Sequence, residues 1–85
     1  DSRNFLLEGK LALTDFFKID KIEKEVFAEV EADADTLAGL ILEIKGAIPV
    51  VGEKIEYNGY VFQIVSADSR RIKKVKLQIP EGYEN

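Results

Sequence analysis

The chain has 85 residues, of which 46% are apolar and 33% charged, so its length and composition fit one folded domain with a modest core. It contains no cysteine and no histidine, which excludes disulfides, cysteine-ligated zinc, thiolate nucleophiles and Ser-His-Asp triads. The formal net charge is −4, and because nucleic-acid-binding domains are usually basic, we expect no nucleic-acid partner.

Residues 4–13 predict an opening β-strand, because apolar side chains recur there on one parity. These side chains are Phe5, Leu7, Leu11 and Leu13. Gly9 interrupts the pattern, which indicates a bulge or the close approach of another backbone segment. Thr14 follows as the predicted N-cap of a short helix that reaches Ile19.

Residues 20–35 fit two patterns. Val26, Ala28 and Val30 alternate as in a strand, whereas Val26, Phe27 and Val30 also fit one face of a helix. Acidic residues make this stretch strongly hydrophilic. We therefore expect a solvated linker with some local structure.

Residues 36–45 predict an amphipathic helix, because their apolar residues follow helical spacing. These residues are Leu37, Leu40, Ile41 and Ile44. Asp35 or Thr36 is the expected N-cap, and Gly46 stands where a C-terminal glycine belongs. Pro49 prevents the helix from continuing.

Three further strands are predicted over residues 54–57, 60–67 and 72–79. Asn58-Gly59 predicts a tight hairpin, because both residues tolerate positive φ. In the last strand Val75, Leu77 and Ile79 are expected to face inward, and residues 80–85 are expected to form a tail. The predicted fold class is α+β, a small antiparallel sheet of about four strands with helices packed on one face.

Several motifs occur in a distinctive order. They are residues 35–43, Gly46-Ala47-Ile48-Pro49, Gly52-Glu53, Tyr57-Asn58-Gly59-Tyr60-Val61-Phe62 and Arg71-Ile72-Lys73-Lys74-Val75. This order resembles the CorC/HlyC transporter-associated domain, with its "TLGGL" helix, "IP–GE" loop, "Y-G–F-V" hairpin and "RI–V-V" last strand. The resemblance covers residues 5–79. Ala38, where a glycine is common, and the acidic stretch at 20–35 depart from the family pattern.

The resemblance implies a non-catalytic regulatory domain of a membrane ion transporter of the magnesium and cobalt efflux type, or of a haemolysin-like CBS protein. In that family the domain follows a membrane domain and a pair of CBS domains, which would be its partners at the cytoplasmic face of the cell membrane. The family fold resembles part of the FAD-binding domains of some oxidases, but no flavin-binding motif is readable here, so no flavin is implied.

The domain organisation expected is one domain over residues 1–85, cut from a longer protein, because the chain contains no methionine. No apolar run approaches the ~20 residues that span a bilayer, so the piece itself is expected to be soluble. A homodimer is possible, since closed dimers are the commonest oligomers.

Two sets of charged residues are candidate sites. Asp33 and Asp35 could bind a divalent cation, the one cofactor we consider, although a helix N-cap with favourable charge is the preferred interpretation. The basic cluster comprises Arg70, Arg71, Lys73, Lys74 and Lys76. It could meet lipid headgroups or a nucleotide phosphate, or simply form a solvated strand face. The alternative function is therefore a sensor that binds a nucleotide or divalent cation directly; an enzyme is not expected.

Overall fold

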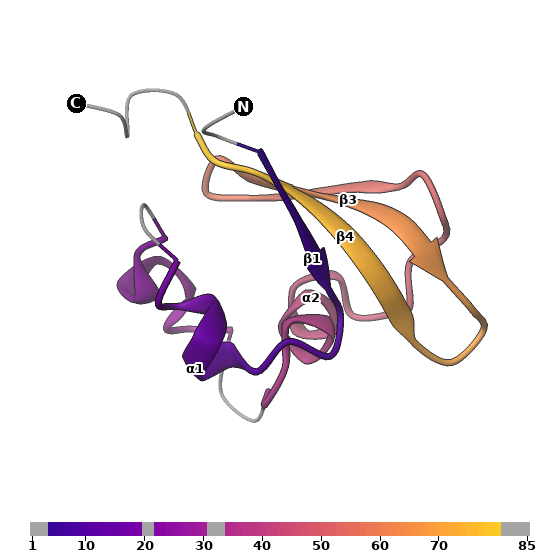
Figure 1. Ribbon diagram of the computed structural model, residues 1–85, viewed down its shortest axis with the longest axis horizontal. Helices are drawn as coiled ribbons and strands as arrows, with labels where there is room; N and C mark the ends of the chain where they lie inside the picture. Colours follow the sequence, from indigo (N-terminus) through magenta and orange to yellow (C-terminus); the bar gives the residue numbers. More distant parts are fainter. Residues whose placement is uncertain (1–3, 20–21, 31–33, 81–85) are drawn as a thin grey trace.

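The computed structural model describes residues 4–19, 22–30 and 34–80. Its strands form one antiparallel sheet in the order β1-β4-β3-β2, and the helices lie against one face of that sheet (Figure 1). The strands are β1 (Asn4–Glu8), β2 (Lys54–Tyr57), β3 (Tyr60–Ala67) and β4 (Ile72–Gln78). The helices are α1 (Leu13–Phe16), the 3₁₀ helix η1 (Lys24–Phe27) and α2 (Leu37–Lys45). The predicted α+β class is confirmed.

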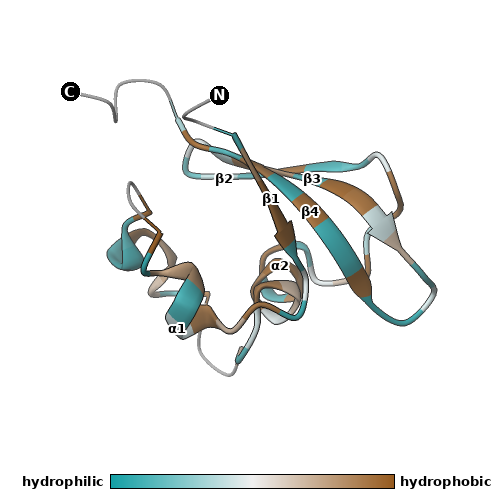
Figure 2. Ribbon diagram, in the orientation of Figure 1, coloured by the Kyte–Doolittle hydropathy of each residue, from teal (hydrophilic) through white to brown (hydrophobic). Residues whose placement is uncertain are grey.

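The hairpin between β2 and β3 forms as predicted. Asn58 and Gly59 adopt φ values of 49° and 91°, the left-handed conformations that a two-residue turn requires. Along β4, Val75 and Leu77 are fully buried, whereas Lys74 and Lys76 are exposed; the apolar and polar residues of the strand are distinguished by colour in Figure 2. This alternation leaves one sheet face for the core and an open face that points away from the helices.

The pairing of β3 with β4 is irregular near the turn that joins them. The register pairs are Ile64–Val75, Ser66–Lys74 and Ala67–Ile72. Val65 on one strand and Lys73 on the other are therefore skipped, which makes a β-bulge in each strand. The bulge explains why Ile72 and Val75, three residues apart, are both buried.

Helix α2 has the caps that its sequence predicts, with Thr36 rather than Asp35 at the N-cap. The Gly39 N–H donates to the Thr36 Oγ1 at 3.2 Å. At the other end, the Gly46 N–H donates to the Leu42 carbonyl at 2.7 Å, with Gly46 at φ 87°. The predicted apolar stripe packs into the core; Leu37, Leu40 and Ile41 are fully buried and Ile44 is half-buried.

The predicted opening strand is wrong beyond Glu8. The Gly9 N–H donates to the Lys73 carbonyl at 2.8 Å, and the Gly9 carbonyl accepts from the Ala38 N–H at 2.9 Å. A turn follows, closed by the Leu11 N–H donating to the Glu8 carbonyl at 3.1 Å. Tertiary contacts at Gly9 thus end the strand, although the apolar alternation continues.

The predicted N-cap of the first helix is also wrong. Helix α1 begins at Leu13, its N-cap position is Ala12, and Thr14 lies inside it. An isolated β-bridge between Ala12 and Thr36 places this start beside the start of α2. The Leu13 N–H donates to the Asp35 carbonyl at 3.0 Å, so a backbone carbonyl satisfies the first N–H of the helix.

The acidic stretch contributes to the core, contrary to the expectation of a solvated linker. Phe27 at the end of η1 is 0% exposed. Its ring stacks on Tyr57 with centroids 5.6 Å apart and lies 5.0 Å from the Tyr60 ring. The Glu23 N–H donates to the Tyr60 hydroxyl oxygen at 3.3 Å. Phe27 and the buried Ile22 therefore anchor a segment whose other described residues are mostly exposed.

Candidate functional site

The turn between β3 and β4 positions the first two residues of the predicted basic cluster. The Asp68 Oδ1 accepts hydrogen bonds from the Arg70 and Arg71 N–H groups, both at 2.8 Å. The Asp68 N–H donates to the Arg71 carbonyl at 3.0 Å. These bonds fix the turn, and the Arg70 N–H, followed by that of Arg71, holds the pKa of Asp68 below its ordinary value.

The residues of the predicted basic cluster line more than one hollow of the surface. Arg71, Lys73 and Lys74 line an open recess of about 350 Å³, here called the basic recess. Its other lining residues are Glu8, Lys10, Ser66 and Ile72. Lys76 lines a second hollow on the open face, together with Lys54. Arg70 lines neither the basic recess nor this second hollow.

Lys10 is a recess residue that the sequence analysis missed. It follows Gly9 in the turn after β1, and β1 pairs with β4 so that Glu8 stands opposite Lys74. The pairing brings Lys10 to the same recess as Lys73 and Lys74. Only the strand order places these residues together, and no local pattern near Lys10 indicates it.

The basic recess carries more positive than negative side chains. Its lining holds four cationic groups, from Lys10, Arg71, Lys73 and Lys74, and one carboxylate, from Glu8. The Lys10 Nζ lies 3.7 Å from the Glu8 Oε1, and the Lys73 Nζ lies 3.8 Å from the Asp68 Oδ2. Because all these side chains are exposed, their ion pairs are weak and exchange readily with an external anion.

The predicted cation-binding pair is only partly within the described residues. Asp33 lies outside them. Asp35 is exposed, and its backbone carbonyl is used by Leu13. Within residues 4–19, 22–30 and 34–80, no three acidic, histidine or cysteine side chains converge on one point. A cation at Asp33 and Asp35 stays a prediction.

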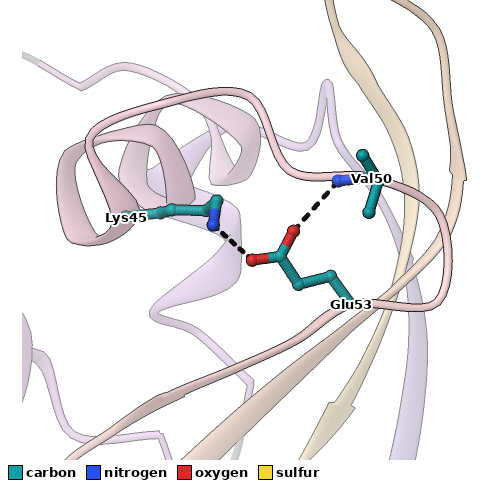
Figure 3. A network of polar contacts seen from close by, with 3 residues as sticks. All are labelled: Lys45, Val50 and Glu53. Carbon is teal, nitrogen blue, oxygen red and sulfur yellow. Dashed lines mark hydrogen bonds and ion pairs between the residues drawn. The ribbon is translucent and has the colours of Figure 1, made fainter.

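The loop between α2 and β2 is held by one acidic side chain (Figure 3). The Lys45 Nζ donates to the Glu53 Oε2, and the Val50 N–H donates to the Glu53 Oε1 at 3.1 Å. Residues 50–53 form a tight turn, here called the valine turn, in which the Glu53 N–H donates to the Val50 carbonyl and Gly52 has φ 91°. The Gly52 N–H joins this turn to Ile64 on β3 at 2.7 Å.

Replacing Glu53 with glutamine is expected to lower the thermal unfolding midpoint near pH 7. Its hydrogen bond with Lys45, and then that with the Val50 N–H, hold the pKa of Glu53 below its ordinary value of 4.5. This stabilisation is therefore present above pH 4.5 and is lost as the pH falls through the lower folded-state pKa. Unfolding curves from pH 7 to pH 2 should show the wild-type and Glu53→Gln midpoints converging in acid. Parallel curves would contradict the assigned role.

A comparison with known families identifies the chain. The family described as transporter associated domain, CorC_HlyC, matches residues 1–81. The chain belongs to the CorC/HlyC family of transporter-associated domains. The resemblance in its motifs is thereby confirmed, and the family is named for its association with transporters and not for an enzymatic reaction.

Individual relatives agree with the family assignment. The magnesium and cobalt efflux protein CorC of Escherichia coli is 41% identical over 51 residues, which are 60% of this domain and 18% of that protein. The match thus spans about a fifth of that curated relative. The transporter associated domain of a Porphyromonas gingivalis CBS domain protein is 36% identical, with a TM-score of 0.80 over 94% of this chain and 92% of that one.

A third relative was solved with metal ions. The CorC_HlyC domain of a Xylella fastidiosa hemolysin, in complex with Mg²⁺ and Mn²⁺, is 32% identical with a TM-score of 0.70, over 89% of this domain and 86% of that chain. No helix in the described ranges of this transporter-associated domain is both long enough and apolar enough to cross a membrane.

Proposed function

We propose that this domain is a non-catalytic regulatory part of a magnesium and cobalt efflux protein, acting through contacts with that protein's other domains. The observation that carries the proposal is the similarity to CorC efflux proteins, of which this domain matches only a small part. A part of that size with its own core is suited to modulate transport by binding. The proposed neighbours are CBS and membrane domains on the cytoplasmic side of the cell membrane.

Regulation by contact requires unequal binding to the states of the transporter. A domain that bound both states equally would shift nothing. Two surfaces of opposite charge could provide the selective contact: the acidic stretch around η1, with exposed Glu23, Glu25 and Glu29, and the open face with Lys74 and Lys76. Complementary charge on a neighbouring domain would select orientation and partner.

Deleting this domain from the efflux protein that contains it tests the proposal. The cation concentration that gives half-maximal efflux is expected to shift about fivefold or more, the lower end of usual coupling between sites. Efflux should be measured in cells with matched expression of intact and truncated protein. An unchanged rate together with an unchanged cation dependence at normal expression would refute the regulatory role.

A pair of charge reversals then locates the contact. Lys74→Glu with Lys76→Glu should reproduce part of the deletion effect, because both side chains lie on the open face. Lys18→Glu, at an exposed residue of the helical layer outside both surfaces, is the control and should leave efflux unchanged. If the open-face variant and the control show the same efflux rate and cation dependence, the open face is excluded as the contact surface and the acidic stretch remains the candidate surface.

Direct cation sensing is the second candidate, favoured by the relative solved with Mg²⁺ and Mn²⁺. Thermal unfolding of this domain with added magnesium, calcium, cobalt or adenine nucleotides tests it. A rise in the midpoint that Asp33→Asn with Asp35→Asn abolishes would support the predicted cation pair. A rise that these substitutions leave intact would place the ligand elsewhere.

A further inference from the structure

Exposed apolar side chains gather at one end of the sheet. Val50 and Val51 in the valine turn are 69% and 58% exposed, and Val65 in the β3 bulge is 43% exposed. A shallow hollow lined by Ile48, Pro49, Val50, Val51, Ala67, Asp68 and Ser69 joins the valine turn to the β3–β4 turn. Exposing adjacent valines at the tip of a turn is unfavourable in water, and such apolar surface commonly marks a contact site.

The basic recess borders the same β3–β4 turn. Its Ser66, Arg71 and Lys73 flank the turn residues that line the apolar hollow. Four cationic groups thus line a recess that adjoins one side of the β3–β4 turn, and the apolar hollow adjoins its other side, in a chain whose net charge is −4. Charge is therefore distributed unevenly over the domain. This end carries basic and apolar side chains, whereas the helical layer carries exposed acids such as Glu23, Glu25 and Glu29.

The valine turn is also preformed. Glu53 receives the Lys45 and Val50 donors, and the Gly52 N–H and the Ile64 N–H tie the turn to β3 by backbone bonds of 2.7 and 2.9 Å. A ligand that covers the valines therefore does not need to order the loop first, which removes one cost of binding.

We propose that this end of the domain docks on the surface of an anionic lipid bilayer. Val50 and Val51 enter the interface between headgroups and acyl chains, while Lys10, Arg71, Lys73 and Lys74 meet the lipid phosphates. A bilayer surface offers negative charge and apolar depth together, as this end requires. The end of the β1–β4 ladder that pairs Asn4 with Gln78 lies at the opposite end of the sheet from the β3–β4 turn (Figure 1).

Vesicle flotation with this 85-residue chain tests the proposal. The domain is expected to float with vesicles of phosphatidylcholine and phosphatidylglycerol in equal parts, and not with phosphatidylcholine alone. Added salt should weaken the binding because it screens the charges. Replacing Arg71 and Lys73 with glutamine should lower the partition coefficient about 25-fold, about fivefold for each cation removed. Val50→Ser with Val51→Ser should lower it about tenfold.

A matched variant separates location from net charge. Lys18→Gln with Lys24→Gln removes the same charge from the helical layer and should bind vesicles like the wild type. Circular dichroism should show that all variants keep the fold.

Three results would overturn the proposal: absence of binding to the anionic vesicles, equal binding to both vesicle types, or equal losses of binding in the Arg71/Lys73 and Lys18/Lys24 variants. Binding of glycerol phosphate to the domain without any binding to vesicles would also overturn it, in favour of a free phosphate ligand. Because transport is not measured, failure here leaves the regulatory proposal standing.

Discussion

Replacing Gly9 with alanine is expected to lower the free energy of unfolding by about 3 kcal/mol or more. A Cβ at this position would lie 2.1 Å from the Ile72 carbonyl oxygen and 3.3 Å from the Ala38 Cβ. The clash is with backbone, so no rotamer change relieves it. Gly9 also links β4 and α2 through its N–H and carbonyl, so any shift weakens both contacts. Urea unfolding followed by circular dichroism measures the loss.

Gly46→Ala is the matched control for this experiment. Gly46 has φ 87°, but, its own chain neighbours apart, no heavy atom of residues 4–19, 22–30 and 34–80 lies within 4 Å of the position of an added Cβ. The substitution should therefore cost only the backbone strain of a left-handed alanine, about 1 kcal/mol. If Gly9→Ala proves no more destabilising than Gly46→Ala, the close approach of β1 to Ile72 is not what requires glycine.

Replacing Phe27 with alanine is expected to cost about 3–5 kcal/mol of stability. The side chain is fully buried, with its ring centroid 6.0 Å from that of Phe16 and 6.1 Å from that of Phe62. Removing it leaves a cavity between η1 and the sheet in addition to losing the transfer free energy. Because small domains have only about 5–15 kcal/mol in total, the variant should be visibly destabilised.

Two further substitutions test the assignment to Phe27. Phe27→Leu keeps most of the volume and should recover much of the loss, and Val26→Ala, at a half-buried neighbour, should cost less than Phe27→Ala. Equal small effects of all three would mean that the segment is the solvated linker that its composition suggests.

Elements with local chemistry were predictable from the sequence. Thr36 and Gly46 mark the two ends of α2, and both are readable from the sequence because caps act within one helical turn. Asn58-Gly59 identifies the hairpin because the turn type demands those residues. The alternation in β4 predicts its buried face correctly, since each side chain position follows from the pleat.

Elements decided by distant contacts were not predictable in the same way. Leu11 and Leu13 continue the parity of β1, yet Gly9 meets Lys73 and Ala38, and the chain turns there. Phe27 lies among acids, and its burial depends on a pocket made by Tyr57 and Tyr60 of the β2–β3 hairpin. The close backbone approach predicted at Gly9 is confirmed, but no short window of sequence identifies the partner of Gly9 or the pocket that buries Phe27.

The candidate site was predicted in part. Arg71, Lys73 and Lys74 do line one recess, whereas Lys76 lines a second hollow with Lys54. Lys10 joins them only through the pairing of β1 with β4. The exposure of Val50 and Val51 was equally hidden, because it depends on how Glu53 folds the preceding loop.

The pairing of β1 with β4 also determines how the domain responds to mechanical load. Asn4 stands opposite Gln78 at one extremity of this antiparallel ladder, and Glu8 stands opposite Lys74 at the other. Tension applied between Asn4 and Gln78 would strain the ladder's hydrogen bonds one after another, as in a zip, instead of shearing them all together. β1 would peel away first and leave the β2–β3–β4 meander paired. Pulling at these two points therefore meets little mechanical resistance.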